Sequence, residues 1–213
     1  MIASTVDEVR GASPTGVMGS GFKERSFAAA LAAKPHFIGC DGGSTDPGPY
    51  PLGACTTAFP RVSIKRDLRL MLKGARGLRV PLLLGSVGTA EGDVHLAGIQ
   101  SIIEEIAAEE RLRFRLGVVR SEQDKPYLKE KLRQGRIKPL HPAPRFDEAV
   151  IGRSTRIVGM MGDDPYLEAL DAGADVVLAE RSSDTAIFAG LPVRHGLPAG
   201  LAWHAAQILE CGA

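Results

Sequence analysis

The stretch VPLLLGSVGTAEGD occupies residues 80–93 and decides the fold that we predict. It begins with the apolar run 80–84, which is typical of a strand buried on both faces of a parallel sheet. Glycines and small polar residues follow, and residues 94–110 then carry Leu and Ile at helical spacing. A buried strand, a glycine-rich loop and an amphipathic helix in this order indicate one unit of a parallel sheet covered by helices.

The same alternation extends through the chain. Further strands are expected at 6–10, 36–40, 113–119, 155–161 and 174–179. Further helices are expected at 22–33, 63–77, 125–134, 164–172, 185–189 and 200–211. We therefore predict a single α/β domain over residues 1–213, with an open, mostly parallel sheet and helices on both faces, layered as in a Rossmann fold.

The overall composition limits the partners. The 213 residues contain 26 Lys or Arg and 25 Asp or Glu, a formal net charge of +1, whereas binders of nucleic acid or acidic membranes carry a basic excess. No apolar run approaches the roughly 18 residues of a membrane span, and residues 1–11 lack the apolar core of a secretory signal. The three cysteines are scattered, so we expect a cytoplasmic protein without nucleic-acid or membrane partners.

The first polar loop, CDGGSTDPGPY at residues 40–50, follows a short apolar strand. Its carboxylates Asp41 and Asp46 can share a proton or bind a hard cation, and either can act as a general base. Ser44 and Thr45 are expected to contact a substrate. The alternative is a structural turn, in which Asp and Ser side chains bond the local backbone.

The second polar loop follows the buried strand at 80–84. Its backbone amides are expected to cradle an anion at the start of the next helix, through Gly85, Ser86, Gly88 and Thr89. The loop is not G-x-G-x-x-G, because position 87 is Val, and it is not a P-loop, because no Lys follows. We therefore predict no dinucleotide cofactor and no hydride transfer.

Two side chains at the start of that helix are also candidates. His95 is expected to act as a general acid or as a ligand, and the alternative is a hydrogen-bonded structural histidine. Asp93 is either the N-cap of the helix or a cation ligand. A divalent cation held by Asp41, Asp46 and Asp93 is one hypothesis, and the metal ligands are otherwise unassigned.

The third polar loop, at residues 180–185, follows the strand ADVVLA. Arg181 is placed to grip a carboxylate or a phosphate with two parallel hydrogen bonds, and Asp184 lies three residues on. The alternative is a plain Arg–Asp surface pair. Because loops at the carboxyl ends of parallel strands share one edge of the sheet, we expect Asp41, Gly85 and Arg181 to line one cleft.

The final helix predicts an interaction surface. Leu201, Ala205 and Ile208 fall on one side of it, and Trp203 lies about a quarter-turn away. One apolar side can pack on the chain's own sheet, so Trp203 requires a second cover. We therefore expect assembly with itself or with another polypeptide near Trp203.

Several stretches together resemble the acyclic terpene utilisation family, named after AtuA. They are DGGSTDPGPYPLG (41–53), IKRDLRLML (64–72), PLLLGSVGTAEGDVHL (81–96), residues 169–196 and GLAWHAAQILECGA (200–213). The namesake of the family belongs to a bacterial pathway that degrades acyclic terpenes through acyl-CoA intermediates. The family's members typically continue past the position that matches Ala213. The resemblance therefore implies that this chain corresponds to the first part of a longer architecture, and that either a separate chain supplies the rest or this is a reduced version.

Two functions from different classes follow. The first is an enzyme subunit that binds a small carboxylic acid or acyl thioester and acts by lyase, hydratase or isomerase chemistry, with Asp41 or Asp46 as base and His95 as acid. The second is a non-catalytic binding or scaffold subunit whose polar loops engage a partner chain.

Overall fold

The structure, a computed structural model, describes residues 7–210. Its centre is a five-stranded sheet in the order β1-β2-β3-β5-β4, and every neighbouring pair of strands is parallel. The strands are β1 (Gly11–Ala12), β2 (Phe37–Gly43), β3 (Leu82–Thr89), β4 (Leu116–Val119) and β5 (Val176–Ala179). The predicted α/β class with an open parallel sheet is confirmed.

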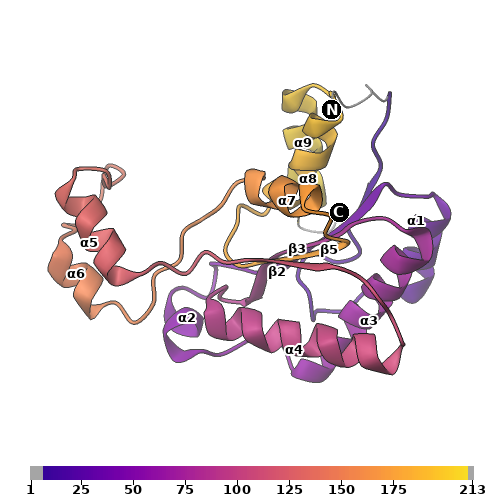
Figure 1. Ribbon diagram of the computed structural model, residues 1–213, viewed down its shortest axis with the longest axis horizontal. Coiled ribbons are helices and arrows are strands. Elements are labelled where there is room, and N and C mark those ends of the chain that lie inside the picture. The colour runs from indigo at the N-terminus through magenta and orange to yellow at the C-terminus, as the bar shows by residue number, and fades with distance from the viewer. Residues whose placement is uncertain (1–6, 211–213) are drawn as a thin grey trace.

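Helices cover both faces of the sheet (Figure 1). One face carries α1 (Glu24–Ala32), α3 (Arg61–Leu78) and α4 (Asp93–Glu109). The other carries α7 (Asp164–Asp171) and α8 (Ala186–Arg194), with α9 (Ala199–Leu209) packed on α8. The remaining helices are α2 (Tyr50–Ala54), α5 (Lys125–Arg133) and α6 (Glu148–Arg153). Among the described residues, no helix combines the length and the apolar character that crossing a membrane requires.

The apolar run at the start of β3 explains why two helical layers form. Leu82 and Leu84 point into the core beneath α3 and α4, whereas Leu83 points into the core beneath α8. All three are buried, and each such leucine contributes roughly 1.5–3 kcal/mol of hydrophobic free energy. A strand without a polar face is stable only when helices cover it on both sides, as they do here.

The topology creates a crevice between β3 and β5. These two strands are hydrogen-bonded neighbours, yet the chain leaves β3 toward α4 on one face and leaves β5 toward α8 on the opposite face. Ligand sites of open α/β sheets form at such a switch point, beyond the carboxyl ends of the strands. The loops after β3 and β5 therefore meet where a site is expected.

Two segments differ from the sequence-based expectations. The loop predicted to begin at Gly85 is strand as far as Thr89, because β2 continues to pair with β3 at Gly85 and Thr89, beyond the last residue paired with β5. The prediction of a strand at 155–161 was wrong. This segment forms only isolated bridges, from Val158 to Glu122 and from Met161 to Ser182, because it leads back to the sheet instead of joining it.

A projecting arm interrupts the connection between β4 and β5. We call residues 125–153, which contain α5 and α6, the arm, and the flanking segments 120–124 and 154–160 its stem. Figure 1 shows the arm standing away from the sheet and its covering helices. Within the arm, residues 134–147 connect α5 to α6.

Candidate acid–base site

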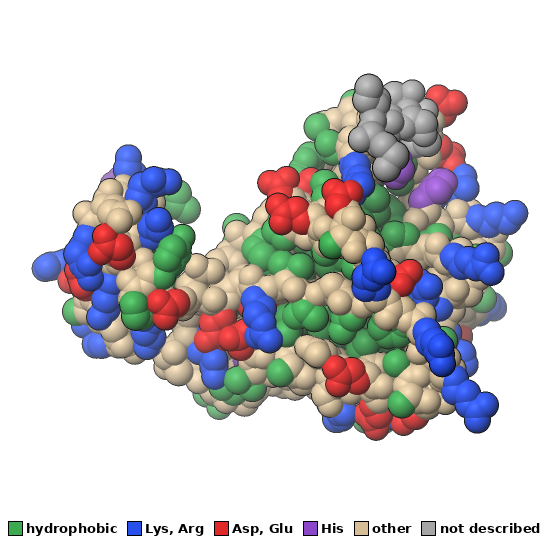
Figure 2. Space-filling model, in the orientation of Figure 1, with side chains coloured by type: hydrophobic (Ala, Val, Ile, Leu, Met, Phe, Trp, Pro, Cys, Tyr) green, Lys and Arg blue, Asp and Glu red, His purple; other side chains and the backbone are tan. Residues whose placement is uncertain are grey.

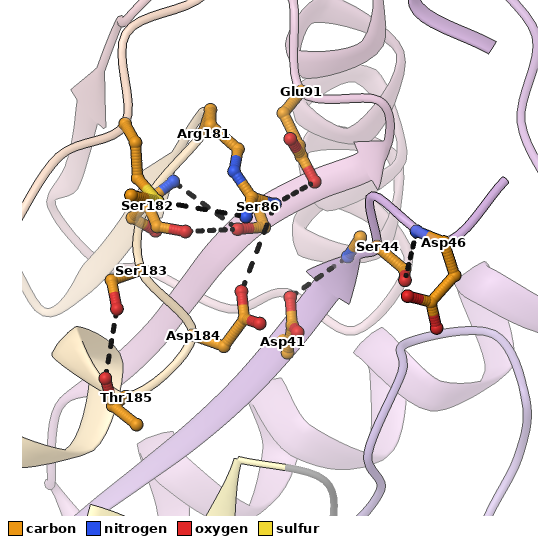
Figure 3. A network of polar contacts seen from close by, with 12 residues as sticks. Asp41, Ser44, Asp46, Ser86, Glu91, Arg181, Ser182, Ser183, Asp184 and Thr185 are labelled. Atoms are coloured by element: carbon orange, nitrogen blue, oxygen red, sulfur yellow. Dashed lines mark hydrogen bonds and ion pairs between the residues drawn. The ribbon is translucent and has the colours of Figure 1, made fainter. Parts of the chain in front are cut away.

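Polar side chains from three strand ends meet at the switch point (Figure 3). Asp41 is on β2, Ser86 is on β3, and Glu91 is in the short loop between β3 and α4. Arg181 and Asp184 are in the loop between β5 and α8. The first and third polar loops thus converge as predicted, and Glu91 joins them from the second.

The backbone around the end of β3 is irregular. Asp41 pairs with Gly85 while Gly43 pairs with Thr89, so the register between β2 and β3 shifts inside the site. Ser86, Thr89 and Glu91 have φ angles of 49°, 75° and 69°, a left-handed conformation that is costly for residues with a Cβ. Such strain concentrates at functional sites, where the surrounding structure holds it in place.

Gly43 is required by this geometry. A methyl group at Gly43 would overlap both the Glu91 carboxylate and the Ser86 carbonyl oxygen. The absent side chain therefore makes room for Glu91 to fold back over the end of β2.

Glu91 and Arg181 form the central ion pair. Arg181 Nη1 lies 2.9 Å from Glu91 Oε1, and the two side chains are 12% and 4% exposed. Burial raises the pKa of Glu91 to about 7, although the Arg181 charge opposes the shift. A carboxyl group with a pKa near the ambient pH is suited to both giving and taking a proton.

Asp41 is a second carboxyl group with a raised pKa. It is 4% exposed, and it accepts one hydrogen bond, from the Gly43 amide at 3.0 Å. Burial, and then the Asp184 charge, raise the pKa of Asp41 to about 8. Burial also raises the pKa of Asp184, and Arg181 at 4.0 Å opposes this shift.

Carboxylate oxygens of Asp41, Asp184 and Glu210 lie within 4.8 Å of one another. Oxygen donors at this spacing are those that a hard divalent cation takes. This group shares only Asp41 with the cation site expected from the sequence, since Asp46 is exposed and Asp93 is paired with Arg120.

Buried hydrogen bonds of two serines and a tyrosine connect the strands and loops that carry the site. Ser86 Oγ donates to the Ser182 carbonyl oxygen at 3.0 Å. The Tyr166 hydroxyl, buried under the sheet edge, lies 2.6 Å from Ser182 Oγ. These bonds tie the end of β3 to the loop that carries Arg181 and so fix the distance between the two.

A cavity of about 370 Å³ opens beside the ion pair. Its lining consists of Ser44, Thr45, Gly48, Pro49, Leu52, Ala90, Glu91, Val158, Met160 and Arg181. Glu91, Arg181 and the two hydroxyl residues make one part polar. Leu52, Val158 and Met160 make another part apolar. Two of the predicted substrate-binding residues, Ser44 and Thr45, and a third, Arg181, therefore line one cavity.

His95 lies elsewhere. It is 3% exposed on α4, and its Nε2 lies 3.1 Å from the Thr56 carbonyl oxygen. Burial lowers the pKa of His95, which favours the neutral ring. It lines a separate cavity of about 150 Å³ with Cys55, and the structure does not bring it to Glu91 and Arg181.

The predicted anion cradle is occupied by the protein itself. The Asp93 amide, at the start of α4, donates to Glu122 Oε2 at 2.8 Å. Thr89 Oγ1 accepts from the Ala58 amide at 3.0 Å. Gly88 makes room for His95, because a Cβ there would lie 2.6 Å from the histidine Cβ. Gly85 makes room for Tyr166 and Ile187, so it lies within the sheet and not on a cleft wall.

Asp46 stands at the rim. Its side chain is exposed, and its amide donates to Ser44 Oγ at 3.1 Å, as in a local turn. Sequence reasoning overlooked Glu91, Tyr166 and Ser182. For Glu91 a signal was present, since a charged residue between small residues at the end of a buried strand has few ways to reach water.

The fold and the site together define a doubly wound α/β protein with a carboxyl–guanidinium site at its switch point. The model of the family described as "Acyclic terpene utilisation family protein AtuA" matches residues 86–213, more than half of the chain. The chain belongs to this family. The match contains the resembling stretches 169–196 and 200–213 and most of 81–96, while 41–53 and 64–72 lie outside it. Comparisons with curated proteins and with solved structures gave no significant match.

Proposed function

We propose that the chain is an enzyme subunit that acts on a small carboxylic acid or acyl thioester by general acid–base chemistry of the lyase, hydratase or isomerase type. The observation that carries the proposal is the cavity beside Glu91 and Arg181. It combines a carboxyl group whose pKa is raised to about 7, a guanidinium and an apolar wall.

Arg181 would bind the substrate. Its guanidinium has five N–H donors. The ion pair with Glu91 uses Nη1, and Nη2 makes a long contact of 4.0 Å to Met160 Sδ, so donors remain that can meet a carboxylate or a carbonyl oxygen. Ser44 and Thr45 add hydroxyl groups at the same cavity. Leu52, Val158 and Met160 would cover a short hydrocarbon chain.

Glu91 would move the proton. As a carboxylate it takes a proton from the carbon next to the substrate carbonyl. The C–H electron pair forms a C=C bond to the carbonyl carbon, and the C=O π pair moves onto the carbonyl oxygen. Arg181 stabilises the negative charge that develops there. The protonated Glu91 then returns the proton to another carbon, which completes an isomerisation, or gives it to a leaving group on the next carbon, which completes an elimination.

Asp41 has a different part in this proposal from the one that the sequence suggested. It does not line the cavity, and burial and the Asp184 charge raise its pKa to about 8. Its protonated form limits the negative charge near Asp184 and Glu91. Asp46, at the rim, would guide an incoming substrate, and His95 would act as a structural support of β3.

The second candidate is a binding subunit without catalysis. The same cavity supports it, because an arginine, two hydroxyls and an apolar wall are also what a carboxylate-binding protein needs. The raised pKa of Glu91 favours the enzyme, since a site built for binding alone gains nothing from a carboxyl group that competes with its ligand for Arg181.

Proton exchange separates the two candidates. The full chain would be incubated in D₂O with short branched carboxylic acids and their thioesters, and loss of the proton next to the carbonyl would be followed by NMR. We expect exchange with the wild type and at least about a 100-fold loss in Glu91→Gln, which removes the base but not the shape. Glu104→Gln, an exposed change on α4, is the matched control. Binding without exchange would favour the second candidate.

A further inference from the structure

The arm buries little of its own surface. No residue of α5 is buried, and Ile151 is the buried residue of α6. Tyr127, Leu140 and Phe146 are exposed by 53%, 88% and 37%. Two short helices with so small a common core gain stability by packing against another surface.

The stem holds the arm firmly. The Gln123 amide donates to the Ile157 carbonyl at 2.8 Å, and the Gly159 amide donates to the Ser121 carbonyl at 2.8 Å. Arg156 pairs with Glu122 at 2.7 Å across the same two segments. The two segments of the stem are therefore held together at the base of the arm.

The arm and the rest of the chain carry opposite charge. Residues 125–153 contain eight Lys or Arg and three Asp or Glu, which leaves 18 Lys or Arg against 22 Asp or Glu elsewhere. The three acids of the arm are already engaged by arginines of the arm. Among the described residues, Arg136 and Lys138 form no ion pair, and both are exposed. Figure 2 shows the basic side chains spread over the arm.

The body offers an acidic surface on α7. Asp164 and Glu168, four residues apart on this helix, are exposed, and neither forms an ion pair within the part of the chain that the structure describes. Figure 2 shows acidic side chains gathered over the region of α7, away from the arm.

We propose that the arm docks on the acidic α7 surface of a second copy of this chain, and that each copy receives the other's arm in the same way. The basic arm and the acidic α7 surface of one chain lie apart from each other. Each can therefore meet the oppositely charged surface of a second copy, which makes a second copy the matching partner. Tyr127, Leu140 and Phe146 supply the apolar part of the contact, and the exposed cations supply its orientation. The proposal is independent of the proposed reaction.

Light scattering and analytical ultracentrifugation of the full chain test the proposal. We expect a dimer whose dissociation constant rises about tenfold or more between 50 and 500 mM NaCl, because screening weakens contacts between exposed charges. Arg136→Glu with Lys138→Glu should weaken the dimer by at least about tenfold. Arg25→Glu with Arg113→Glu, the same charge change on exposed arginines of the body, should leave it unchanged.

A charge exchange makes the test specific. Asp164→Lys with Glu168→Lys, added to the two arm changes, should restore the dimer, and circular dichroism would verify that every variant is folded. A monomeric wild type would overturn the proposal. So would a dimer insensitive to the arm changes, which would place the interface elsewhere, such as the exposed Trp203 on α9. A monomer that binds heparin through the arm would show that the partner is an external polyanion.

Discussion

Arg181 Nη1 and Glu91 Oε1 lie 2.9 Å apart and join the loop after β5 to the loop after β3. The pair bridges the two neighbouring strands from which the chain departs to opposite faces of the sheet. Both partners are largely buried, so this contact resists screening by salt better than a surface pair does. Its position makes it the centre of the proposed acid–base site, and the following predictions depend on it.

Removing the Arg181 charge should raise the pKa of Glu91 further. Arg181 opposes the effect of burial, so Arg181→Met leaves burial unopposed. The pH at which the rate of proton exchange reaches half of its maximum should therefore move above 7. Arg181→Lys keeps a charge but loses the planar fork, and should mainly weaken carboxylate binding, by roughly 10-fold or more. A pH–rate profile that stays the same in Arg181→Met would contradict the role of the pair.

Asp41 should make the protein less stable as the pH rises. Its pKa is about 8 in the folded chain and 3.8 ordinarily, so the folded state holds a proton that the unfolded state has lost. The free energy of unfolding therefore falls between about pH 4 and pH 8. Asp41→Asn removes this contribution. The variant's gain in the free energy of unfolding over the wild type should therefore grow across that range, to on the order of several kcal/mol at pH 8, and its melting temperature should rise with it.

Thermal unfolding by circular dichroism at pH 5, 6.5 and 8 measures the effect. Glu91 contributes in the same direction, because its pKa is also raised, so a smaller slope remains in Asp41→Asn. Asp46→Asn is the matched control, since this carboxylate is exposed. Equal pH dependence in Asp41→Asn and the wild type would show that Asp41 is ionised in the folded chain.

Gly43→Ala should disturb the site through crowding. The added methyl group overlaps the Glu91 carboxylate and the Ser86 carbonyl oxygen, and the latter belongs to a buried strand that moves little. We expect a loss of about 1–3 kcal/mol in the free energy of unfolding and a loss of exchange activity. Gly77→Ala, at an exposed helical position with open space around it, should be neutral or stabilising. A fully active and stable Gly43→Ala would show that Glu91 does not lie over β2.

Met160 should set the preference for substrate chain length. It lines the apolar part of the cavity from the stem of the arm and is 69% exposed, so replacing it changes the cavity more than the core. Met160→Ala should favour longer hydrocarbon chains and Met160→Trp should exclude them, with the melting temperature unchanged. Relative exchange rates for two acids that differ in chain length check this. Identical ratios in both variants would place the hydrocarbon chain elsewhere.

The features that repeat along the chain were predictable from the sequence. The continuous apolar run 80–84 indicated a buried strand, and the helical spacing of Leu and Ile in 94–110 indicated a helix. The alternation of such elements led to the parallel sheet. The convergence of the loops that carry Asp41 and Arg181 followed from the rule that carboxyl ends of parallel strands share one edge. Local composition was enough to identify each strand and helix, because each can be recognised by itself. The convergence of the loops then needed only the general rule for parallel sheets.

The features that depend on packing between elements were not predictable. Residues 85–89 have loop-like composition, and only pairing with β2, at Gly85 and Thr89, makes them a strand. His95 shares a helix face with Ile99 and Ile102, which points it into the core, so its spacing from these residues was a usable signal. The composition around Glu91 was a signal that its side chain matters, but its position depends on the left-handed backbone at Ser86 and Thr89 and on the space left by Gly43, which are set by packing between β2 and β3.

The most direct measurement is the pKa of Glu91 itself. Carbon-detected NMR of the full chain, labelled at the glutamate carboxyl carbon, would follow the signal that disappears in Glu91→Gln as the pH is changed from 4 to 9. The account predicts titration near pH 7, because burial outweighs the opposing charge of Arg181. Titration near 4.5, the ordinary value for glutamate, would show that Glu91 is a fixed carboxylate at neutral pH and would contradict the acid–base site.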